Sequence, residues 1–364
     1  MPRSSAPRPR ATLASLAAEL KVSRTTVSNA YNRPDQLSAE LRERVLDTAR
    51  RVGYPGPDPV ARSLRTRRAG TVGLLLTERL NYSFSDPAAV DFLAGLAESC
   101  EEAGQGLLLV AVGPGRSLED GSNAVLNAGV DGFVVYSVAD DDPFLQVALK
   151  RRLPVVVVDQ PKNVPGASGV CIDDRAAMRG VTEYVLELGH REIGLVTMRL
   201  GAERLPGPVA IASPDRLRSP HFHVQRERIG GVHDAMTAAG LDPESLTVVE
   251  SPDHQPTSGG AAAAVALDAN PRITALMCTA DVLALSAMDY LRGRGIYVPG
   301  QMTVTGFDAI PEARRRGLCT VAQSSLEKGR TAGKLLHHPP RTGLPVEEVL
   351  PTQLIRGRTA RPPA

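Results

Sequence analysis

Apolar runs of strand length alternate with segments of helical periodicity from residue 71 onward. The runs lie at 72–77, 106–112, 132–138, 154–159, 193–198, 247–251, 275–279 and 302–308. The helical segments lie at 88–103, 117–128, 175–188, 228–239, 258–269, 284–292 and 326–336. Continuous apolar strands separated by helices are typical of parallel sheets that helices cover on both faces. Because one such unit is shorter than residues 70–364, the pattern predicts two doubly wound α/β lobes with a cleft between them. We expect one lobe at about 71–172 and 324–338, and the other at about 173–323 and 345–357.

The composition excludes several classes of protein. Apolar residues make up 42% of the 364 residues and charged residues 23%, which is ordinary for a globular chain. No apolar run reaches the length of a membrane-spanning helix, and the basic N-terminus lacks the apolar stretch of a signal peptide. The four cysteines are scattered without a C-x-x-C pair, which argues against a disulfide framework or a structural zinc site. We therefore expect a cytoplasmic protein that does not bind membranes.

Charge is distributed unevenly along the chain. The first 70 residues hold 14 Lys and Arg against 6 Asp and Glu, whereas the rest holds 28 against 34. A basic head on an acidic body is typical of a polyanion-binding module joined to a body that binds no polyanion. The alternative is a solvated basic tail.

The basic head has the pattern of a small helical domain. Residues 1–11 are rich in Pro, Ser and Arg, so we expect a disordered basic arm there. Within 12–56, the residues Thr12, Ser23 and Ser38 are placed to cap three short helices, the second starting at Arg24. Two short helices joined by a tight break and braced by a third form a helix-turn-helix, so the fold expected for 12–56 is an all-α DNA-binding head.

The second of these helices presents polar side chains without an acidic residue. Its outward positions are Arg24, Thr25, Thr26, Ser28, Asn29 and Asn32. Guanidinium, hydroxyl and amide groups are those that read base edges and contact phosphates. The alternative is an ordinary polar helix face.

Residues 57–69 predict a short basic helix and linker. Asp58 and Pro59 are placed to start this helix, which is too short to be stable alone. Leu64 would then wedge into a minor-groove step while Arg62 and Arg65 hold phosphates. A plain interdomain linker is the alternative.

The segments TLASLAAELKVSRTTVSNAYN, LSAELRERVLDTARRVGY and VARSLRTRRAGTVGLLL resemble the N-terminus of the lactose/galactose repressor (LacI/GalR) family of bacterial transcription regulators. The resemblance implies that Arg24, Thr25 and Asn29 read bases and that Leu64 intercalates at the operator centre. The expected DNA-backbone contacts are Thr12, Ser23, Thr26, Ser28, Asn32, Arg62 and Arg65. One departure is the segment 55–59, which is one residue longer than usual before the hinge helix.

Polar residues follow several predicted strands of the body. Asp159, Asp281 and Asp308 each come after an apolar run, and Arg228 opens a predicted helix after a long loop. Ligands in α/β folds bind beyond the carboxyl ends of the strands, where Asp and Arg suit a polar small molecule. Each such Asp can instead be a helix cap or a turn residue.

The family resemblance continues through PVVVVDQP, GVCIDDRAAMRGVTEYVLELGHREIGLV, RERIGGVHDAM, ITALMCTADVLALSAM, MTVTGFD and LPTQLIRG. It implies a core similar to periplasmic sugar-binding proteins, with effector contacts at Asp159, Arg228 and Asp308 and with Gln323 near the pocket. Two departures are Ala280-Asp281 in place of the family's Asn-Asp, and a longer loop at 199–227. Because of these two departures, the resemblance does not imply which particular sugar the chain binds.

No catalytic motif is present. The chain has no G-K-[ST] phosphate loop, G-x-S-x-G or H-E-x-x-H sequence. His221 and His223 in the long loop, with His233, are more typical of a solvated surface than of a metal site. We expect no enzyme activity, no cofactor and no metal.

These observations together predict a ligand-responsive transcription regulator, a repressor, at the bacterial nucleoid. Its expected partners are a double-stranded, near-palindromic DNA operator and a small polar effector of the sugar or nucleoside kind. We expect a homodimer, because the C-terminal TARPPA is predicted to be a disordered tail rather than a tetramerisation helix. A small-molecule binding or transport protein with a basic arm is the alternative, and a sugar-modifying enzyme would need an acid/base pair that the sequence lacks.

Overall fold

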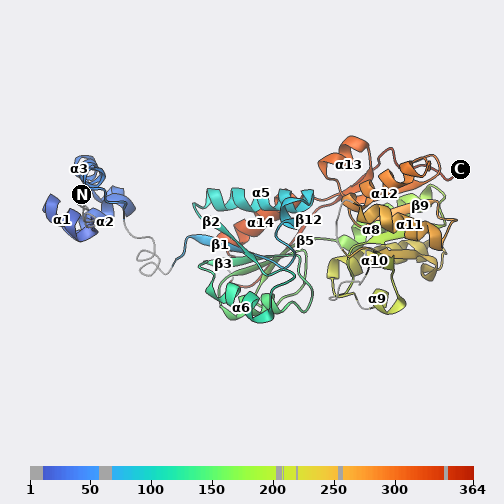
Figure 1. Ribbon diagram of the computed structural model, residues 1–364, viewed down its shortest axis with the longest axis horizontal. Helices are drawn as coiled ribbons and strands as arrows, with labels where there is room; N and C mark the ends of the chain where they lie inside the picture. Colours follow the sequence, from blue (N-terminus) through green and yellow to red (C-terminus); the bar gives the residue numbers. More distant parts are fainter. Residues whose placement is uncertain are drawn as a thin grey trace, which may run out of the picture. The chain divides into compact units, whose positions relative to one another are not determined.

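The computed structural model describes residues 11–56, 68–201, 207, 209–218, 220–252, 257–339 and 343–364. The chain forms two compact units, Met1–Ala69 and Gly70–Ala364 (Figure 1). Residues 1–10 of the predicted arm at 1–11 lie outside the described residues, as do Arg62, Leu64 and Arg65 of the predicted hinge helix.

The N-terminal unit is a helix-turn-helix, as predicted. Its helices are α1 (Leu13–Leu20), α2 (Arg24–Asn32) and α3 (Ala39–Val52), with a 3-10 turn η1 at Pro34–Gln36. The side chains of Thr12, Ser23 and Ser38 accept backbone N–H groups at the three helix starts. Lys21, with φ of 55°, makes the tight break between α1 and α2. The core of the unit consists of Leu16, Ala17, Val27, Ala30, Val45 and Ala49.

The first lobe of the larger unit is built on a six-stranded parallel sheet with the order β12-β5-β4-β3-β1-β2. The strands are β1 (Thr71–Leu76), β2 (Gly106–Ala111), β3 (Gly132–Tyr136), β4 (Val155–Val158), β5 (Ser168–Ile172) and β12 (Glu347–Leu350). Helices α5 (Pro87–Glu102) and α14 (Ser325–His337) cover one face, and α6 (Leu118–Asn127) and α7 (Pro143–Lys150) cover the other. The predicted doubly wound fold is confirmed here: Val72, Leu74 and Leu76 pack under α5 and α14, whereas Leu75 packs toward α6 and α7.

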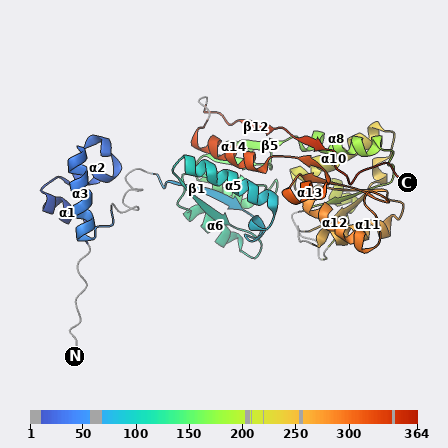
Figure 2. The same cartoon turned by 90° about the horizontal axis from the view of Figure 1, so that it is seen from above.

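Helices α5 and α14 lie side by side and approach closely at glycines (Figure 2). A Cβ atom added at Gly95 of α5 would lie 1.9 Å from the carbonyl oxygen of Leu326, and one at Gly329 of α14 would lie 2.2 Å from that of Phe92. The two helix backbones can therefore meet only because these positions have no side chain.

We expect Gly95→Ala to destabilise the chain, because the added methyl group forces α5 and α14 apart. Overpacking of this kind costs about 1–3 kcal/mol. Gly180→Ala in α8 (Asp174–Glu187) is the matched control: a Cβ atom there meets nothing within 4 Å, so a gain of about 0.4–1 kcal/mol is expected. Denaturant unfolding followed by circular dichroism measures both. Equal stability of the two variants would contradict the close packing.

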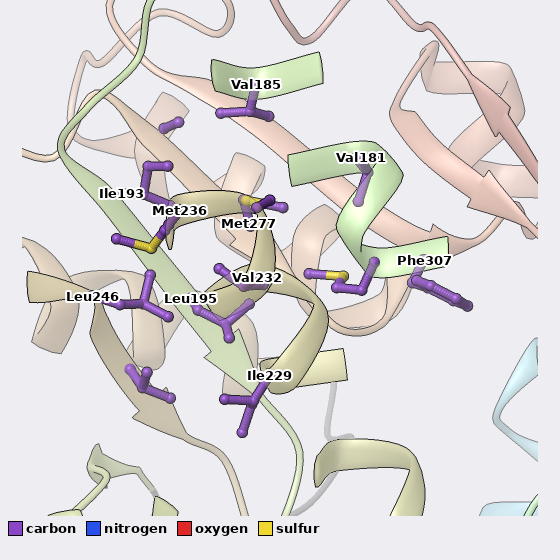
Figure 3. Close-up of a cluster of buried hydrophobic side chains, with 14 of the residues drawn as sticks. Val181, Val185, Ile193, Leu195, Ile229, Val232, Met236, Leu246, Met277 and Phe307 are labelled. Atoms are coloured by element: carbon purple, nitrogen blue, oxygen red, sulfur yellow. The ribbon is translucent and has the colours of Figure 1, made fainter. Parts of the chain in front are cut away.

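The second lobe has a seven-stranded sheet with the order β13-β11-β10-β9-β6-β8-β7. Its strands are β6 (Ile193–Thr197), β7 (Ala210–Ile211), β8 (Thr247–Glu250), β9 (Ala275–Cys278), β10 (Thr303–Asp308), β11 (Cys319–Ala322) and β13 (Gln353–Ile355). Helices α8 (Asp174–Glu187) and α10 (His223–Ala238) pack on one face, where Figure 3 shows Val181, Ile229 and Val232 among the core side chains. The helices α11 (Ser258–Ala269) and α12 (Asp281–Gly293) pack on the other.

Short and edge elements were not predicted. The strands β5, β7, β11, β12 and β13 are too short or too polar to form a continuous apolar run. The outer strands β7 and β13 are antiparallel to their neighbours. The strand β12 pairs with β5, so Glu347–Leu350 lies in the first lobe and not in the second, where the sequence placed it. The helices α7, α9 (Pro214–Arg218) and α13 (Pro311–Arg316) were not predicted either.

Two other expectations were wrong. The helix α10 begins at His223, so Arg228 lies inside it rather than at its start; residues 223–227 include no helix breaker. The C-terminal TARPPA is not a disordered tail, because Thr359 donates a hydrogen bond to the carbonyl of Val304 (2.6 Å) and the backbone N–H of Arg361 donates to Thr303 (3.1 Å). In the described part of the chain, no helix is both long and apolar enough to span a membrane.

Candidate functional site

The first candidate site is the exposed face of α2 in the N-terminal unit. Arg24 and Thr25 occupy the first turn of this helix and are exposed. Ser23 accepts the backbone N–H of Thr26 (2.9 Å), and the two hydroxyls are hydrogen-bonded to each other (2.8 Å). Ser23 and Thr26 are thus held by the cap, while the side chains of Arg24 and Thr25 face solvent.

The second half of the α2 face is an ordered set of amides. The Asn29 side chain donates a hydrogen bond to Gln36 of η1 (3.1 Å), and the Asn32 side chain donates to Ser28, at both its carbonyl (3.0 Å) and its hydroxyl (3.2 Å). Thr12, the remaining predicted backbone contact of the described residues, caps α1 and is exposed. The face therefore presents amide, hydroxyl and guanidinium groups and no carboxylate, a set able to contact both bases and phosphates.

The second candidate site is a hydrogen-bonded chain of polar side chains that joins the two lobes of the larger unit. The ammonium of Lys328, on α14, donates to Asp159 at the end of β4 and to Gln323 after β11. The Gln323 amide in turn donates to Asp308 at the end of β10 (2.6 Å). The Lys328 side chain is only 2% exposed, so its charge is buried against its partners. Three of the five predicted effector residues are thus brought together.

Arg228, the fourth predicted residue, lies in the interior of the second lobe. Its Nε donates to Asp174 Oδ1 (2.8 Å), a second nitrogen donates to the carbonyl of Thr279, and the guanidinium stacks 3.7 Å from the centre of the Phe307 ring. Arg228 is 4% exposed. The other oxygen of Asp174 is buried and has no hydrogen-bond partner among the described residues. A buried oxygen without a hydrogen-bond donor costs free energy. A bound molecule that donates a hydrogen bond to this oxygen would remove that cost.

Asp281, the fifth predicted residue, lies beneath the site rather than in it. It is 0% exposed, and both its oxygens are engaged: Oδ1 accepts from the Thr320 hydroxyl (2.6 Å) and Oδ2 from the backbone N–H of Ile310 (2.9 Å). These bonds hold the turn that follows Asp308. Asp281 therefore orders the site without an oxygen left for a ligand.

The backbone at the strand ends is in an unusual conformation. Ser137, Asp159 and Asp308, at the carboxyl ends of β3, β4 and β10, have φ of 49°, 65° and 116°. Non-glycine residues in this region cost of order 1–3 kcal/mol each and cluster at functional sites. Of these three residues, Asp159 and Asp308 belong to the hydrogen-bonded chain that joins the lobes.

The buried carboxyls have raised pKa values. Burial is the main cause for Asp308, and Asp86 adds to it, whereas Arg228, Gln323 and Lys328 lower the pKa. Burial also raises the pKa of Asp281, and the charge of Asp308 raises it further. Each carboxyl therefore retains a proton to a higher pH than an exposed aspartate does.

We expect the core to lose stability as pH rises, because the folded chain holds protons that the unfolded chain has released. For Asp281 the stabilisation is present below about pH 4, the ordinary value for an aspartate, and is lost as pH rises through its folded pKa of about 8. Asp281→Asn does not titrate, so the melting temperature of the wild type should fall relative to the variant between pH 5 and pH 8. Calorimetry on the full-length protein measures this; parallel pH profiles would contradict it.

An aromatic wall from the first lobe faces these charges. The Tyr82 hydroxyl donates to Asp86 Oδ2 (2.8 Å), and Tyr136 stacks on Phe92 with ring centres 4.2 Å apart. Burial raises the pKa of both tyrosines, and the carboxylates of Asp86 and Asp308 raise it further. The wall is therefore neutral and apolar, with hydroxyl groups at its edge. A cavity of about 450 Å³ is lined by Asp308, Gln323 and residues of α5. Asp159, Arg228 and the three aromatic residues are not part of its lining.

Two ion pairs join the second lobe to the first. Arg226 pairs with Asp140 (2.9 Å), and Arg199, which follows β6, pairs with Glu78 (2.8 Å). Both acidic partners belong to the first lobe. The sequence assigned Arg226 to a long loop at 199–227, but it lies in the first turn of α10. A change in the separation of the lobes would alter both ion pairs.

The sequence did not single out Lys328 or Asp174. Lys328 lies on the buried face of α14 with Ala332 and Leu336. A lysine at the helical spacing of buried apolar residues could have indicated a buried charge. Asp174 follows β5, a strand that the apolar pattern did not show. Among the described residues, no three His, Cys, Asp or Glu side chains lie together in a way that would hold a metal ion.

Comparisons with known proteins identify the family of this chain. Residues 182–360 match the family model described as a periplasmic binding protein-like domain. An HTH-type transcriptional regulator of Mycolicibacterium smegmatis is 74% identical over 366 residues, covering 100% of both chains. A solved LacI-family transcriptional regulator from Corynebacterium glutamicum is 36% identical, with a TM-score of 0.73 over 97% of this chain and 100% of that one. The transcriptional regulator CelR in complex with cellobiose is 27% identical, with a TM-score of 0.66 over 96% and 100%. The chain therefore belongs to the LacI family of transcriptional regulators.

Proposed function

We propose that this regulator acts as a repressor that binds a near-palindromic DNA operator as a homodimer, under the control of a small polyhydroxylated effector. The observation that carries the DNA-binding part is the exposed face of α2, which combines an arginine, hydroxyls and amides with no acidic residue. One such face reads few bases, so a specific site requires two heads related by twofold symmetry.

In this proposal each residue of the head has a distinct role. Arg24, Thr25 and Asn29 contact base edges in the major groove. The side chains of Thr12, Ser23, Thr26, Ser28 and Asn32 contact the DNA backbone. Arg62 and Arg65 of the segment between the two units add phosphate contacts, and Leu64 wedges into the central minor-groove step.

The effector is proposed to bind against Asp159, Arg228, Asp308 and Gln323, with Asp281 positioning the turn after Asp308. The neighbouring Asp174 oxygen and the aromatic wall suit a molecule with hydroxyl donors on its edge and an apolar face, as sugars have. The buried Lys328 and Arg228 are already paired with Asp159 and Asp174, which disfavours an anionic ligand. The cellobiose complex of CelR supports the same class.

Control of DNA binding would act through the separation of the lobes. An effector that touches Asp159 of the first lobe and Arg228 of the second favours one separation over others. The ion pairs Arg226–Asp140 and Arg199–Glu78 would form or break as the separation of the lobes changes. A coupling free energy of about 1–3 kcal/mol is typical, or roughly 5- to 150-fold in operator affinity.

A two-step measurement tests the proposal. Calorimetric melting of the full-length protein against sugars, polyols, nucleosides and amino acids identifies stabilising ligands. Each stabilising ligand is then added to an operator titration. We expect a hydroxyl-rich ligand to stabilise the core and to change operator affinity by a factor within the range above. Stabilisation by ligands without any change in operator affinity would contradict effector control.

A regulator of this kind works on bacterial DNA. We therefore place it in the cytoplasm at the nucleoid.

A further inference from the structure

A second polar cluster lies beside Asp159 in the first lobe, and none of its own residues has a role in the proposed function. Lys162 lies in the segment that follows β4, Cys171 lies on β5, and Glu347 lies on β12, the edge strand that pairs with β5. Neighbouring elements of one sheet thus bring an amine, a thiol and a carboxylate together from distant parts of the sequence.

The lysine and the cysteine are unusually close. The distance from Lys162 Nζ to Cys171 Sγ is 2.6 Å. This is shorter than the roughly 2.9 Å of an ordinary N–H···O hydrogen bond, although sulfur is a larger atom than oxygen. A nitrogen and a sulfur atom at this separation leave no room for an ordinary N–H···S contact, but they are spaced as they would be if one oxygen atom were bonded to both.

Cys171 also differs from other cysteines of the chain in its surroundings. The thiols of Cys100 and Cys278 lie in apolar core clusters. Cys171 lines a cavity of about 340 Å³ together with Asp159, Lys162, Glu347 and the loop 163–167. A molecule as small as a peroxide can occupy a cavity of this size, so the Cys171 thiol can meet an oxidant inside the fold.

We propose that Lys162 and Cys171 form an oxidation site at which a peroxide installs a covalent Nζ–O–Sγ bridge between the two side chains. Neither Lys162 nor Cys171 belongs to the DNA-binding or effector-binding residues proposed above.

The reaction balances with two molecules of hydrogen peroxide. In the first step the Cys171 sulfur is oxidised to sulfenic acid, and the peroxide is reduced to water. In the second step the sulfenic oxygen bonds to the deprotonated Lys162 nitrogen; two hydrogens, one from nitrogen and one from oxygen, leave with the second peroxide as two molecules of water. The S–O bond of the sulfenic acid is kept, and one N–O bond is formed.

The Cys171 thiol and the Lys162 ammonium both hold their protons more tightly than usual. Burial raises the pKa of the Cys171 thiol, and the Lys162 ammonium opposes that rise. Burial lowers the pKa of the Lys162 ammonium, but its hydrogen bonds to Cys171 and to Glu347 (3.1 Å) raise it more. The bridge therefore forms from the deprotonated thiol and amine, whose fractions grow as pH rises.

Peptide mass analysis of the full-length protein tests the proposal. The protein is treated with hydrogen peroxide, denatured, alkylated with iodoacetamide and digested with trypsin. Trypsin cleaves after Lys162 only when its amine is free. We expect loss of that cleavage and a new, unalkylated peptide spanning 153–175, heavier by one oxygen and lighter by two hydrogens than the reduced, uncleaved peptide. Dithiothreitol should restore both the cleavage and the alkylation of Cys171.

Two variants and one internal control make the result specific. In Lys162→Met and in Cys171→Ala, the peptide with the oxygen-bridge mass should be absent. Cys100, buried in the apolar core, should be alkylated as in untreated protein. Normal cleavage after Lys162 in the treated wild type would overturn the proposal, as would irreversible sulfonic acid at Cys171 beside a free lysine. A bridged peptide that has lost two hydrogens without gaining oxygen would also overturn it, because that mass indicates a direct nitrogen–sulfur bond.

Discussion

Replacing Arg228 with methionine is expected to remove most of the response of operator binding at an effector concentration near the wild-type Kd, while DNA binding itself persists. Among the described residues, Arg228 alone combines contact with the Phe307 ring, a hydrogen bond to Asp174 and a place beside Asp308. A hydrogen bond from a charged group contributes about 1.5–3 kcal/mol, so effector affinity should fall roughly 10- to 150-fold. Calorimetric titration of the ligand and an operator titration with and without it measure the two effects separately.

The design must separate this effect from a loss of folding. Removing Arg228 leaves Asp174 as an unpaired buried carboxylate, which costs about 3–5 kcal/mol in comparable sites. The double variant Arg228→Met/Asp174→Asn removes that charge and should recover part of the stability without recovering the response. Arg179→Met is the matched control, because Arg179 pairs with Glu183 on the solvent side of α8. An undiminished effector response in Arg228→Met would take Arg228 out of the effector site.

Asn29→Ala is expected to relax the choice of base at one position in each half of the operator. The Asn29 amide lies on the exposed face of α2 and is oriented by its hydrogen bond to Gln36. A bidentate contact between an amide and a base discriminates by about 1–3 kcal/mol, and a dimer makes the contact twice. Binding to a full set of single-base operator variants measures the preference at every position.

Gln36→Ala is the control for this prediction. This variant removes the hydrogen-bond partner of the Asn29 side chain but keeps the Asn29 amide on the helix face. The preferred base should therefore stay the same, and operator affinity should fall by a smaller factor than in Asn29→Ala. If Asn29→Ala kept the full preference at every operator position, Asn29 would have no part in base recognition.

The sequence predicted those parts of the fold that rest on local patterns. The caps of Thr12, Ser23 and Ser38 and the strands β1 to β4 can be recognised because each depends on residues next to one another in the chain. Elements that depend on distant partners were missed. The strand β12 has the sequence EEVL, and its pairing with β5 is what makes it a strand. The C-terminal tail is ordered because Thr359 and Arg361 bond to β10, which no local pattern indicates.

The same distinction applies to the effector site. Asp159 and Asp308 were identified because each ends an apolar run. Lys328 was missed, although its charge is buried among the predicted residues, because a lysine within a helix is ordinarily a surface residue. Asp281 was grouped with the site because it follows β9. Its carboxylate instead accepts hydrogen bonds from Thr320 and Ile310, which hold the side chain below the site. A strand end fixes where a residue lies in the fold, and long-range contacts determine which way its side chain points.

Selection of binding sites from random double-stranded DNA is the most direct test of the central claim, that this chain is a sequence-specific regulator. The purified full-length protein is used, bound DNA is sequenced, and the selection is repeated at several salt concentrations. We predict a near-palindromic site with two matching halves and a preferred central step, retained at the higher salt concentrations. Binding that falls steeply with salt and shows no preference for any sequence would contradict the account, because it would reduce the basic head to a non-specific polyanion-binding arm.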